Sequence, residues 1–400
     1  MKASVGVNER SFFVPILTEK VHAIEPLDPR IVQAQQDPGS ASVKQFPNPY
    51  SVEIHACTKE AVKAAKERRC VPTASFPKPV EETRFVFVNS EVLLDEMIED
   101  IAKSGECAID LEHNDFRSYR GITCLIQVST RDTDYVVDPF PLGPLLERLN
   151  RVTTDSRIKK VLHAGDLDVI WLQRDFGVYI VNMFDTSQAA QLAEVAGGHG
   201  LGNLLEVFCG VKTDKAYQMA DWRKRPLPAG MLQYARLDTH YLLFIREKLE
   251  EILLTIGTGD EVSVWGKHKL VLAIEKSFGV SSKAYTDVPP DYEPAALKKL
   301  LSKLPGSKVG SVKTNAKVKA CLVGILRWRD DVARRIDESK HFVLNNNACF
   351  KLANAIPTTP AQIQRLVGHP GSGMFAGMVV GPNEALQLVS YIVAEISNLE

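Results

Sequence analysis

Two patterns of apolar residues alternate between residues 84 and 255. One consists of short runs in which apolar and polar positions alternate, and the other of longer segments in which apolar residues recur every three or four positions. The first pattern predicts β-strands and the second predicts amphipathic helices. The predicted strands are 85–88, 107–112, 122–130, 134–137, 159–163 and 180–184, and the predicted helices are 91–103, 166–175 and 228–254. Three successive strands followed by strand and helix in alternation indicate an α/β fold, with a mixed sheet and helices on both faces.

The N-terminal segment has a different pattern. Nine of the 22 prolines fall before residue 80, where no apolar periodicity is sustained. Proline at that density excludes long helices and central strands. We therefore expect an extended arm that wraps a domain, with aromatic anchors at Phe12, Phe13, Phe46, Tyr50 and Phe76.

A second break follows the α/β region. Pro289, Pro290 and Pro294 mark a linker, and helical periodicity then returns. The helices predicted there are 298–304, 318–338, 348–355, 360–366 and 384–399, which together form a small all-α domain. The expected division is an arm at 1–80, an α/β domain at 81–255, a linker at 256–310 and an all-α domain at 311–400.

The predicted strand at 107–112 contains two carboxylates, Asp110 and Glu112, among apolar residues. Strand side chains alternate between faces, so both carboxylates point one way while Ile109 and Leu111 point the other. Two anions held side by side in an apolar element repel each other and are poorly solvated unless something neutralises them. A metal ion is one candidate, although an isolated Asp-x-Glu is more often a strand-end salt bridge or a solvated face.

Two further acidic residues lie on predicted helices. Asp168 lies at the start of a helix, where a carboxylate is commonly only a cap or a dipole partner. Asp238 lies well inside the helix 228–254, one turn after Tyr234, so these two side chains project from one face. A mid-helix Asp is intrinsically unfavourable, which indicates that it has a ligand or a partner. Arg236 lies on a different face and is a poor candidate for that partner.

Composition excludes several classes of protein. An apolar fraction of 45% and a charged fraction of 24% are those of an ordinary globular protein, and 400 residues suffice for roughly two to three domains. The seven cysteines never form a C-x-x-C pair and no secretory signal opens the chain, which favours a reducing compartment and argues against structural zinc. No run of 18 apolar residues is present, so we expect no membrane-spanning segment.

Charge is distributed unevenly along the chain. The net charge of −1 would disfavour a polyanionic partner. The segment 298–351, however, holds nine Lys and four Arg against three Asp and one Glu, a net charge of +9. Local basicity of this size can attract a phosphate backbone, although a solvated, lysine-rich helical face would explain it equally well.

The acids and the tyrosine form an ordered set: Asp-x-Glu, then Asp, then Tyr-x-x-x-Asp. This set resembles the DEDD exonuclease superfamily, in its tyrosine-bearing subgroup, and specifically the RNase D family. The resemblance extends to the runs DLEHNDFRSY (110–119), IQVST (126–130), WLQRDFG (171–177), NMFDT (182–186) and ADWRKRPLP (220–228). After the linker, LRWRDDVARRIDES (326–339) with VLNN (343–346) resembles the helicase-and-RNase-D C-terminal domain, abbreviated HRDC. RecQ helicases carry a similar domain, but the absence of a GxxxxGK[ST] phosphate loop excludes a helicase within this chain.

The resemblance implies an RNase H-like mixed sheet flanked by helices and a metal-dependent, hydrolytic 3′–5′ exoribonuclease that releases nucleoside 5′-monophosphates. It implies two Mg²⁺ or Mn²⁺ ions, held directly or through water by Asp110, Glu112, Asp168 and Asp238. Oxygen-only ligands favour these hard ions over zinc. By the same resemblance Tyr234 orients the attacking water, since a phenol is a poor general base at neutral pH.

His240 could be mistaken for the general base of the histidine-bearing subgroup. It follows Asp238, whereas the histidine of that subgroup precedes its aspartate by five residues. We therefore interpret His240 as a helix-packing or surface residue.

Substrate contacts are assigned mainly by the resemblance. His113 follows the carboxylate pair and Trp171 lies one turn beyond the first helical acid, so both are placed to contact the terminal ribose or to stack on a base. On its pattern alone, Trp171 would be a core residue. Lys215 is expected to meet a phosphate, with a solvated lysine as the alternative. Arg223 and Arg225 are expected to approach the active face, although ordinary ion pairs would explain either.

Within the RNase D family, the chain looks most like the exoribonuclease subunit of the eukaryotic nuclear exosome. This implies single-stranded RNA 3′ ends as substrates, the exosome core and nuclear cofactors as partners, and a location in the nucleus and its nucleolus. The family's N-terminal partner-binding domain and basic C-terminal tail are not recognisable, so we expect a shortened chain. Two alternatives stay open: an inactive scaffold that binds RNA and exosome partners, and a DNA 3′–5′ exonuclease, since nothing in the sequence identifies a 2′-hydroxyl reader.

If the basic segment 298–351 faces the entrance of the active site, it would contact RNA through Lys313, Lys317 and Lys319. Neutralising these three lysines together should then weaken RNA binding and flatten its salt dependence.

Overall fold

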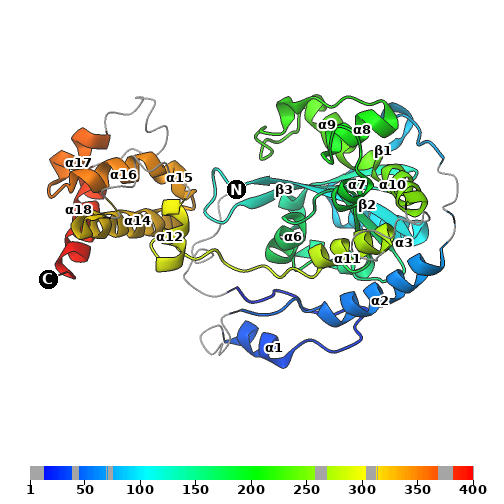
Figure 1. Cartoon of the computed structure of the whole chain (residues 1–400), viewed down its shortest axis with the longest axis horizontal. Helices are drawn as coiled ribbons and strands as arrows, with labels where there is room; N and C mark the ends of the chain where they lie inside the picture. Colours follow the sequence, from blue (N-terminus) through cyan, green and yellow to red (C-terminus); the bar gives the residue numbers. More distant parts are fainter. Residues whose placement is uncertain are drawn as a thin grey trace. The chain divides into compact units, whose positions relative to one another are not determined.

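The computed structural model in Figure 1 describes residues 13–37, 45–68, 70, 75–256, 268–302, 312, 314–367 and 382–399, with Lys215, Ile256 and Pro382 described by their backbone alone. These residues form two compact units. The first unit contains the described residues from 13 to 113 together with Thr123–Thr286. The second unit contains Asn114–Ile122 and the chain from Asp287 onwards.

A six-stranded mixed sheet organises the first unit, with the strand order β1-β4-β3-β2-β5-β6. The strands are β1 (Arg84–Val88), β2 (Glu106–Asn114), β3 (Ile122–Ser129), β4 (Thr133–Val137), β5 (Lys159–Leu162) and β6 (Met183–Asp185). β1 pairs with β4 in parallel, β3 pairs with β4 antiparallel, and β5 pairs in parallel with both β2 and β6. The mixed sheet expected from the sequence is confirmed, and each predicted strand overlaps an observed one.

The helices of the first unit are α1 (Pro29–Gln36), α2 (Ser51–Glu67), α3 (Glu91–Ser104), α4 (Pro139–Leu142), α5 (Asn150–Thr153), α6 (Asp168–Phe176), α7 (Thr186–Ala193), α8 (Leu201–Cys209), α9 (Ala229–His240), α10 (Leu242–Ile256) and α11 (Lys269–Ser281). Three short 3₁₀ helices accompany them, η2 (Val80–Glu82), η3 (Gly143–Leu149) and η4 (Lys215–Tyr217). The sequence pattern predicted α3, α6 and the α9–α10 region, but not α7, α8 or α11.

Helices cover both faces of the sheet, as expected (Figure 1). On one face, Ile109 of β2 enters a core with Leu94 of α3 and Leu172 of α6. On the other face, Ala108 of β2 packs against Leu242 of α10. β2 therefore alternates between two buried faces, and its two carboxylates share the face of Ala108.

Two predicted elements of the first unit are corrected by the structure. The single helix predicted at 228–254 is interrupted at Tyr241, so that it forms α9 and α10. The linker predicted at 256–310 includes α11, which packs against α2, α7 and β6. Seven of the 13 residues of α11 are buried, so this helix is part of the folded unit and not of a linker.

The N-terminal arm is extended only in part. It includes the 17-residue helix α2, because no proline interrupts the chain between Pro49 and Pro72. Three of the predicted aromatic anchors are confirmed: Phe46 and Tyr50 are buried, and the ring of Phe13 meets that of Tyr285 at 4.7 Å. Phe76 is largely exposed but contacts Phe244 and Tyr241, and Phe12 lies outside the described residues.

The second unit is helical, as predicted. Its helices are α12 (Pro294–Ser302), α14 (Ala316–Ile336), α15 (Lys340–Val343), α16 (Asn346–Ala355), α17 (Pro360–Val367) and α18 (Pro382–Ser397). The 21-residue α14 packs against α16 and α18, and it buries Trp328 and Leu322 in the core of this unit.

The loop between β2 and β3 belongs to the second unit. In this loop Arg117 donates two hydrogen bonds to Glu338, at 2.9 and 2.8 Å. The backbone N–H of Tyr119 donates to Asp337 at 3.0 Å. The chain therefore leaves the first unit after β2, contributes a loop to the second unit, and returns to form β3.

Candidate metal centre

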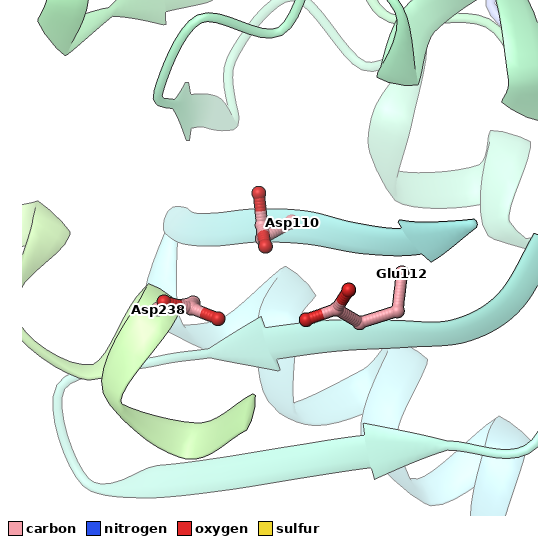
Figure 2. A group of neighbouring side chains, drawn as sticks. All are labelled: Asp110, Glu112 and Asp238. Atoms are coloured by element: carbon pink, nitrogen blue, oxygen red, sulfur yellow. The ribbon is translucent and has the colours of Figure 1, made fainter. Parts of the chain in front are cut away.

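Asp110 and Glu112 of β2 and Asp238 of α9 form one group of carboxylates (Figure 2). One carboxylate oxygen of each residue lies within 4.8 Å of the others. In Figure 2 Asp238 and Glu112 extend toward each other, one from the helix and one from the strand. Asp110 and Glu112 are half-buried, and Asp238 is buried. The structure thus brings together three of the four acids that the sequence singled out.

Burial and mutual repulsion raise the pKa values of these three carboxyls. Burial raises the pKa of Asp110 to about 7. Burial, together with the charges of the neighbouring acids, raises the pKa of Glu112 to about 10. Burial and the charge of Asp110 also raise the pKa of Asp238. These shifts mean that the ionised carboxylates lack compensating positive charge, and a set of oxygen donors in this state fits a hard divalent cation.

Asp168 lies in the first turn of α6 and is buried. It is not one of the three acids whose oxygens lie within 4.8 Å of one another. Burial and the charge of Asp110 raise its pKa, and its own charge contributes to the raised pKa of Glu112. Asp168 is therefore close enough to act electrostatically on the group.

Tyr234 lies one helical turn before Asp238 in α9 and is half-buried. Its ring centroid lies 5.8 Å from that of Tyr217 and 6.0 Å from that of Trp222. Burial, followed by the charges of the three acids, raises the pKa of its hydroxyl. The phenol is therefore protonated near neutral pH, where it can donate or accept a hydrogen bond but cannot act as a base.

α9 is anchored to the sheet by Asp134 of β4, which the sequence analysis did not single out. The Asp134 carboxylate accepts hydrogen bonds from Arg236 at 2.9 and 3.1 Å and lies 3.0 Å from Nδ1 of His240. These contacts hold α9 on both sides of Asp238, and they confirm His240 as a helix-packing residue and Arg236 as the partner of another acid. Asp134 is an acid inside a predicted strand, which is the signal that singled out the carboxylate pair of β2.

His113 at the end of β2 and Trp171 of α6 form a stacked pair. Their ring centroids lie 3.9 Å apart, and the planes differ by 4°. Nη2 of Arg174 lies 3.0 Å from Nε2 of His113, and Asp175 pairs with Arg174 at 2.5 Å. Asp175 also accepts hydrogen bonds from the backbone N–H and hydroxyl of Thr123. The two residues assigned separately to the substrate thus stack face to face on each other, held by contacts that no local sequence pattern predicts.

For Lys215, Arg223 and Arg225 the structure gives local contacts only. Lys215 begins η4, and its side chain lies outside the described part of the chain. Arg223 pairs with Asp221 at 2.7 Å, and Arg225 pairs with Asp138 at 2.7 Å. Both arginines thus form ion pairs, and their approach to the active face stays a prediction.

The basic segment 298–351 contains two kinds of charge. Lys317 and Lys319 are exposed at the start of α14, and Lys313 lies outside the described residues. Arg329, by contrast, is fully buried and pairs with Asp291 at 2.7 Å. Part of the net charge is thus structural, and the role of the segment in RNA binding stays a prediction.

Comparison with known proteins assigns a segment of each unit to a protein family. Residues 85–254 match the family model of a 3′–5′ exonuclease domain, and residues 319–373 match that of the HRDC domain. The crystal structure of the catalytic core of RRP6 from Trypanosoma brucei superposes with a TM-score of 0.72 and is 30% identical, covering 85% of this chain and 88% of that one. The chain belongs to the RRP6 family of 3′–5′ exonucleases. The RNase D-like resemblance with an HRDC domain, drawn from the sequence motifs, is thereby confirmed.

Curated relatives in the RRP6 family are longer than this chain. Exosome complex component 10 of Homo sapiens is 36% identical over 349 residues, which are 87% of this chain and 36% of that protein. Exosome complex exonuclease RRP6 of Saccharomyces cerevisiae is 36% identical over 362 residues, which are 89% of this chain and 47% of that protein. The chain thus spans less than half the length of these two relatives. None of the described helices has the length and apolarity needed to span a membrane.

Proposed function

We propose that this chain is a metal-dependent, hydrolytic 3′–5′ exoribonuclease that releases nucleoside 5′-monophosphates from the 3′ ends of single-stranded RNA. The observation that carries the proposal is the group of Asp110, Glu112 and Asp238, whose oxygens lie within 4.8 Å of one another on a fold of the RRP6 family. Family membership supports the reaction. The retained group of mutually repelling acids supports an active enzyme over an inactive scaffold.

The proposed cofactor is a pair of Mg²⁺ or Mn²⁺ ions, held by Asp110, Glu112, Asp168 and Asp238. Bound divalent ions in such a site lower the pKa of a water and stabilise the leaving oxygen. The fit rests on the donor set, because every ligand in the group is a carboxylate oxygen, which suits hard ions. The raised pKa values support the same conclusion, since the ionised acids need external positive charge.

Tyr234 is proposed to position the attacking water. Its protonated hydroxyl can hold the water by a hydrogen bond, while its raised pKa excludes it as the group that removes the proton. α9 fixes Tyr234 and Asp238 one turn apart, and the contacts of Asp134 with Arg236 and His240 hold that helix against the sheet.

The stacked rings of His113 and Trp171 are proposed to receive the 3′-terminal nucleotide. An outer face of this stacked pair can bind any base by stacking, which suits an enzyme that removes one nucleotide after another regardless of sequence. Lys215 is proposed to contact a phosphate of the RNA.

The proposed setting follows from the relatives, which are named as components of the exosome. We propose that the chain acts with the RNA exosome core and nuclear cofactors in RNA processing and decay. The same relatives support a location in the nucleus, including the nucleolus.

The test uses oligonucleotides of one sequence, supplied as RNA with a 3′-hydroxyl, RNA with a 3′-phosphate, and DNA. With Mg²⁺ or Mn²⁺ the 3′-hydroxyl RNA should be shortened from its 3′ end with release of nucleoside 5′-monophosphates, and the 3′-phosphate should block this. Faster degradation of the DNA would identify a DNA exonuclease. Binding of RNA without turnover in either metal would identify a scaffold, and each result would overturn the proposal.

A further inference from the structure

Gln127 of β3 is a buried polar residue that has not been given a role in the metal centre described above. Its side chain is fully buried, and neither its amide nitrogen nor its amide oxygen has a hydrogen-bond partner among the described residues. An unpaired buried amide is costly, and in native proteins such a group usually has a function or an ion or water as its partner.

The strand pattern places Gln127 on the face of the sheet that carries the carboxylate group. Ser129 lies two residues further along β3 and therefore points to the same face. The hydroxyl of Ser129 lies 2.8 Å from that of Thr239 in α9, so this is the face that α9 covers. α9 also supplies Asp238 to the group, and β2, which supplies the other two acids, is the neighbour of β3 in the sheet.

The other polar groups beneath α9 pair with one another. Ser129 donates to Asp134 at 2.8 Å, and Asp134 also contacts Arg236 and His240. The carboxylates of β2 lie on the same face of the sheet, on the strand next to Gln127. Side chains of adjacent strands on one face lie about 5 Å apart at Cβ, a span that glutamine can bridge. Its Nε2 can donate two hydrogen bonds to carboxylate oxygens.

We infer that Gln127 is a positioning residue of the metal centre: its amide has no partner in the metal-free structure, and its Nε2 donates to a ligating carboxylate of β2 once that carboxylate holds a cation. This inference rests on the proposed function, because it assumes that these acids bind a divalent ion. Ligating carboxylates are commonly hydrogen-bonded to such a partner, and losing it weakens metal affinity. The apolar neighbours Ile126 and Val128 make Gln127 the one polar interruption in that part of the strand.

The test replaces the amide by apolar groups of similar size, Gln127→Met and Gln127→Leu, in the whole chain. Mn²⁺ is titrated into the metal-free protein by calorimetry, and thermal unfolding is recorded without metal. We expect the Mn²⁺ dissociation constant to rise by about tenfold or more in both variants. We expect the metal-free Tm to stay equal or rise, because the amide has no partner to lose. At saturating Mn²⁺ the KM for RNA should be unchanged.

Gln173 provides the matched control. It is also buried, but its Nε2 donates to the carbonyl oxygen of Lys283 at 2.8 Å and its Oε1 accepts from the backbone N–H of Tyr285 at 2.9 Å. Gln173→Met should therefore lower the metal-free Tm and leave Mn²⁺ affinity unchanged, the opposite of Gln127→Met.

Two outcomes would overturn the inference in distinguishable ways. Unchanged Mn²⁺ affinity in folded Gln127→Met or Gln127→Leu would make Gln127 a packing residue only. Unchanged Mn²⁺ affinity in Asp110→Asn would instead remove the metal centre of the proposed function, and the role of Gln127 with it.

Discussion

The two ends of β2 hold carboxylates in opposite electrostatic environments. At its start, Glu106 pairs with Arg131 at 2.7 Å and with Arg246 at 2.8 Å. Toward its end, Asp110 and Glu112 face burial and other acids, and both have raised pKa values. The chain supplies its own cations at one end of the strand, whereas at the other end the proposed function requires cations from solution.

Glu250 of α10 shows that burial alone does not decide this difference. Its side chain is 2% exposed, and it pairs with Arg68 at 2.8 Å, Arg246 at 3.1 Å and Lys159 at 3.3 Å. Burial by itself would raise the pKa of Glu250, but the charges of these three cations lower it. Glu112 lies in the same unit with a pKa of about 10. The nearby charges therefore determine whether a buried acid is ionised in the metal-free protein.

Asp110→Asn should have the largest effect, because it removes a proposed metal ligand at the unpaired end of β2. We expect kcat on 3′-hydroxyl RNA to fall by about 10³-fold or more, with RNA binding retained. The metal-free Tm should rise, since one of the repelling acids is neutralised. Single-turnover kinetics, fluorescence anisotropy and thermal unfolding measure the three quantities.

Glu106→Gln at the paired end of β2 is the control for this variant. It should lower the Tm and leave kcat unchanged, because it removes the partner of two arginines and no proposed ligand. Full activity in Asp110→Asn, or a loss of activity of equal size in Glu106→Gln, would break the contrast between the two ends.

Glu250→Gln should have the next largest effect, which is a loss of stability. It leaves three cations beside a buried neutral amide, which should lower the free energy of unfolding by about 3 kcal/mol. Urea unfolding of the metal-free protein measures this loss, while Mn²⁺ affinity in the folded variant should not change. A stability equal to that of the unsubstituted protein would show that the ion pairs of Glu250 contribute nothing net.

A change of pH tests the same comparison without altering any residue. The folded-state pKa values of Asp110 and Glu112, about 7 and about 10, exceed their ordinary values of 3.8 and 4.5. The folded protein therefore binds more protons than the unfolded chain between these limits, so these acids make stability fall as the pH rises. The metal-free Tm should therefore fall steadily from about pH 5 to about pH 8.

Two controls accompany the pH series. Mn²⁺ should flatten the slope because the cation takes the place of the protons, and Asp110→Asn should remove the part of the slope near neutral pH. A slope that is the same in the unsubstituted protein and in Asp110→Asn would mean that Asp110 is already ionised in the metal-free fold.

The parts of the molecule that were predictable are those in which local pattern and burial agree. The side chains of β2 alternate between two buried faces, so two carboxylates on one of these faces depart clearly from the apolar pattern of a buried strand. This departure directed attention to the other acids of the group. α11 was missed because its burial depends on contacts with α2, α7 and β6, which lie far from it in the sequence. The interruption at Tyr241, the stack of His113 on Trp171 and the anchoring of α9 by Asp134 depend on contacts between distant segments, which a periodicity search does not detect.

The loop between β2 and β3 also determines how this protein could be dissected. Among the described residues the chain passes between the two units after His113, after Ile122 and after Thr286, so no single cut separates them. A cut at residue 286 would leave Arg117 on one fragment and its partner Glu338 on the other. The second unit therefore cannot be exchanged as one continuous segment of chain. A replacement unit would also need a β2–β3 loop that matches it.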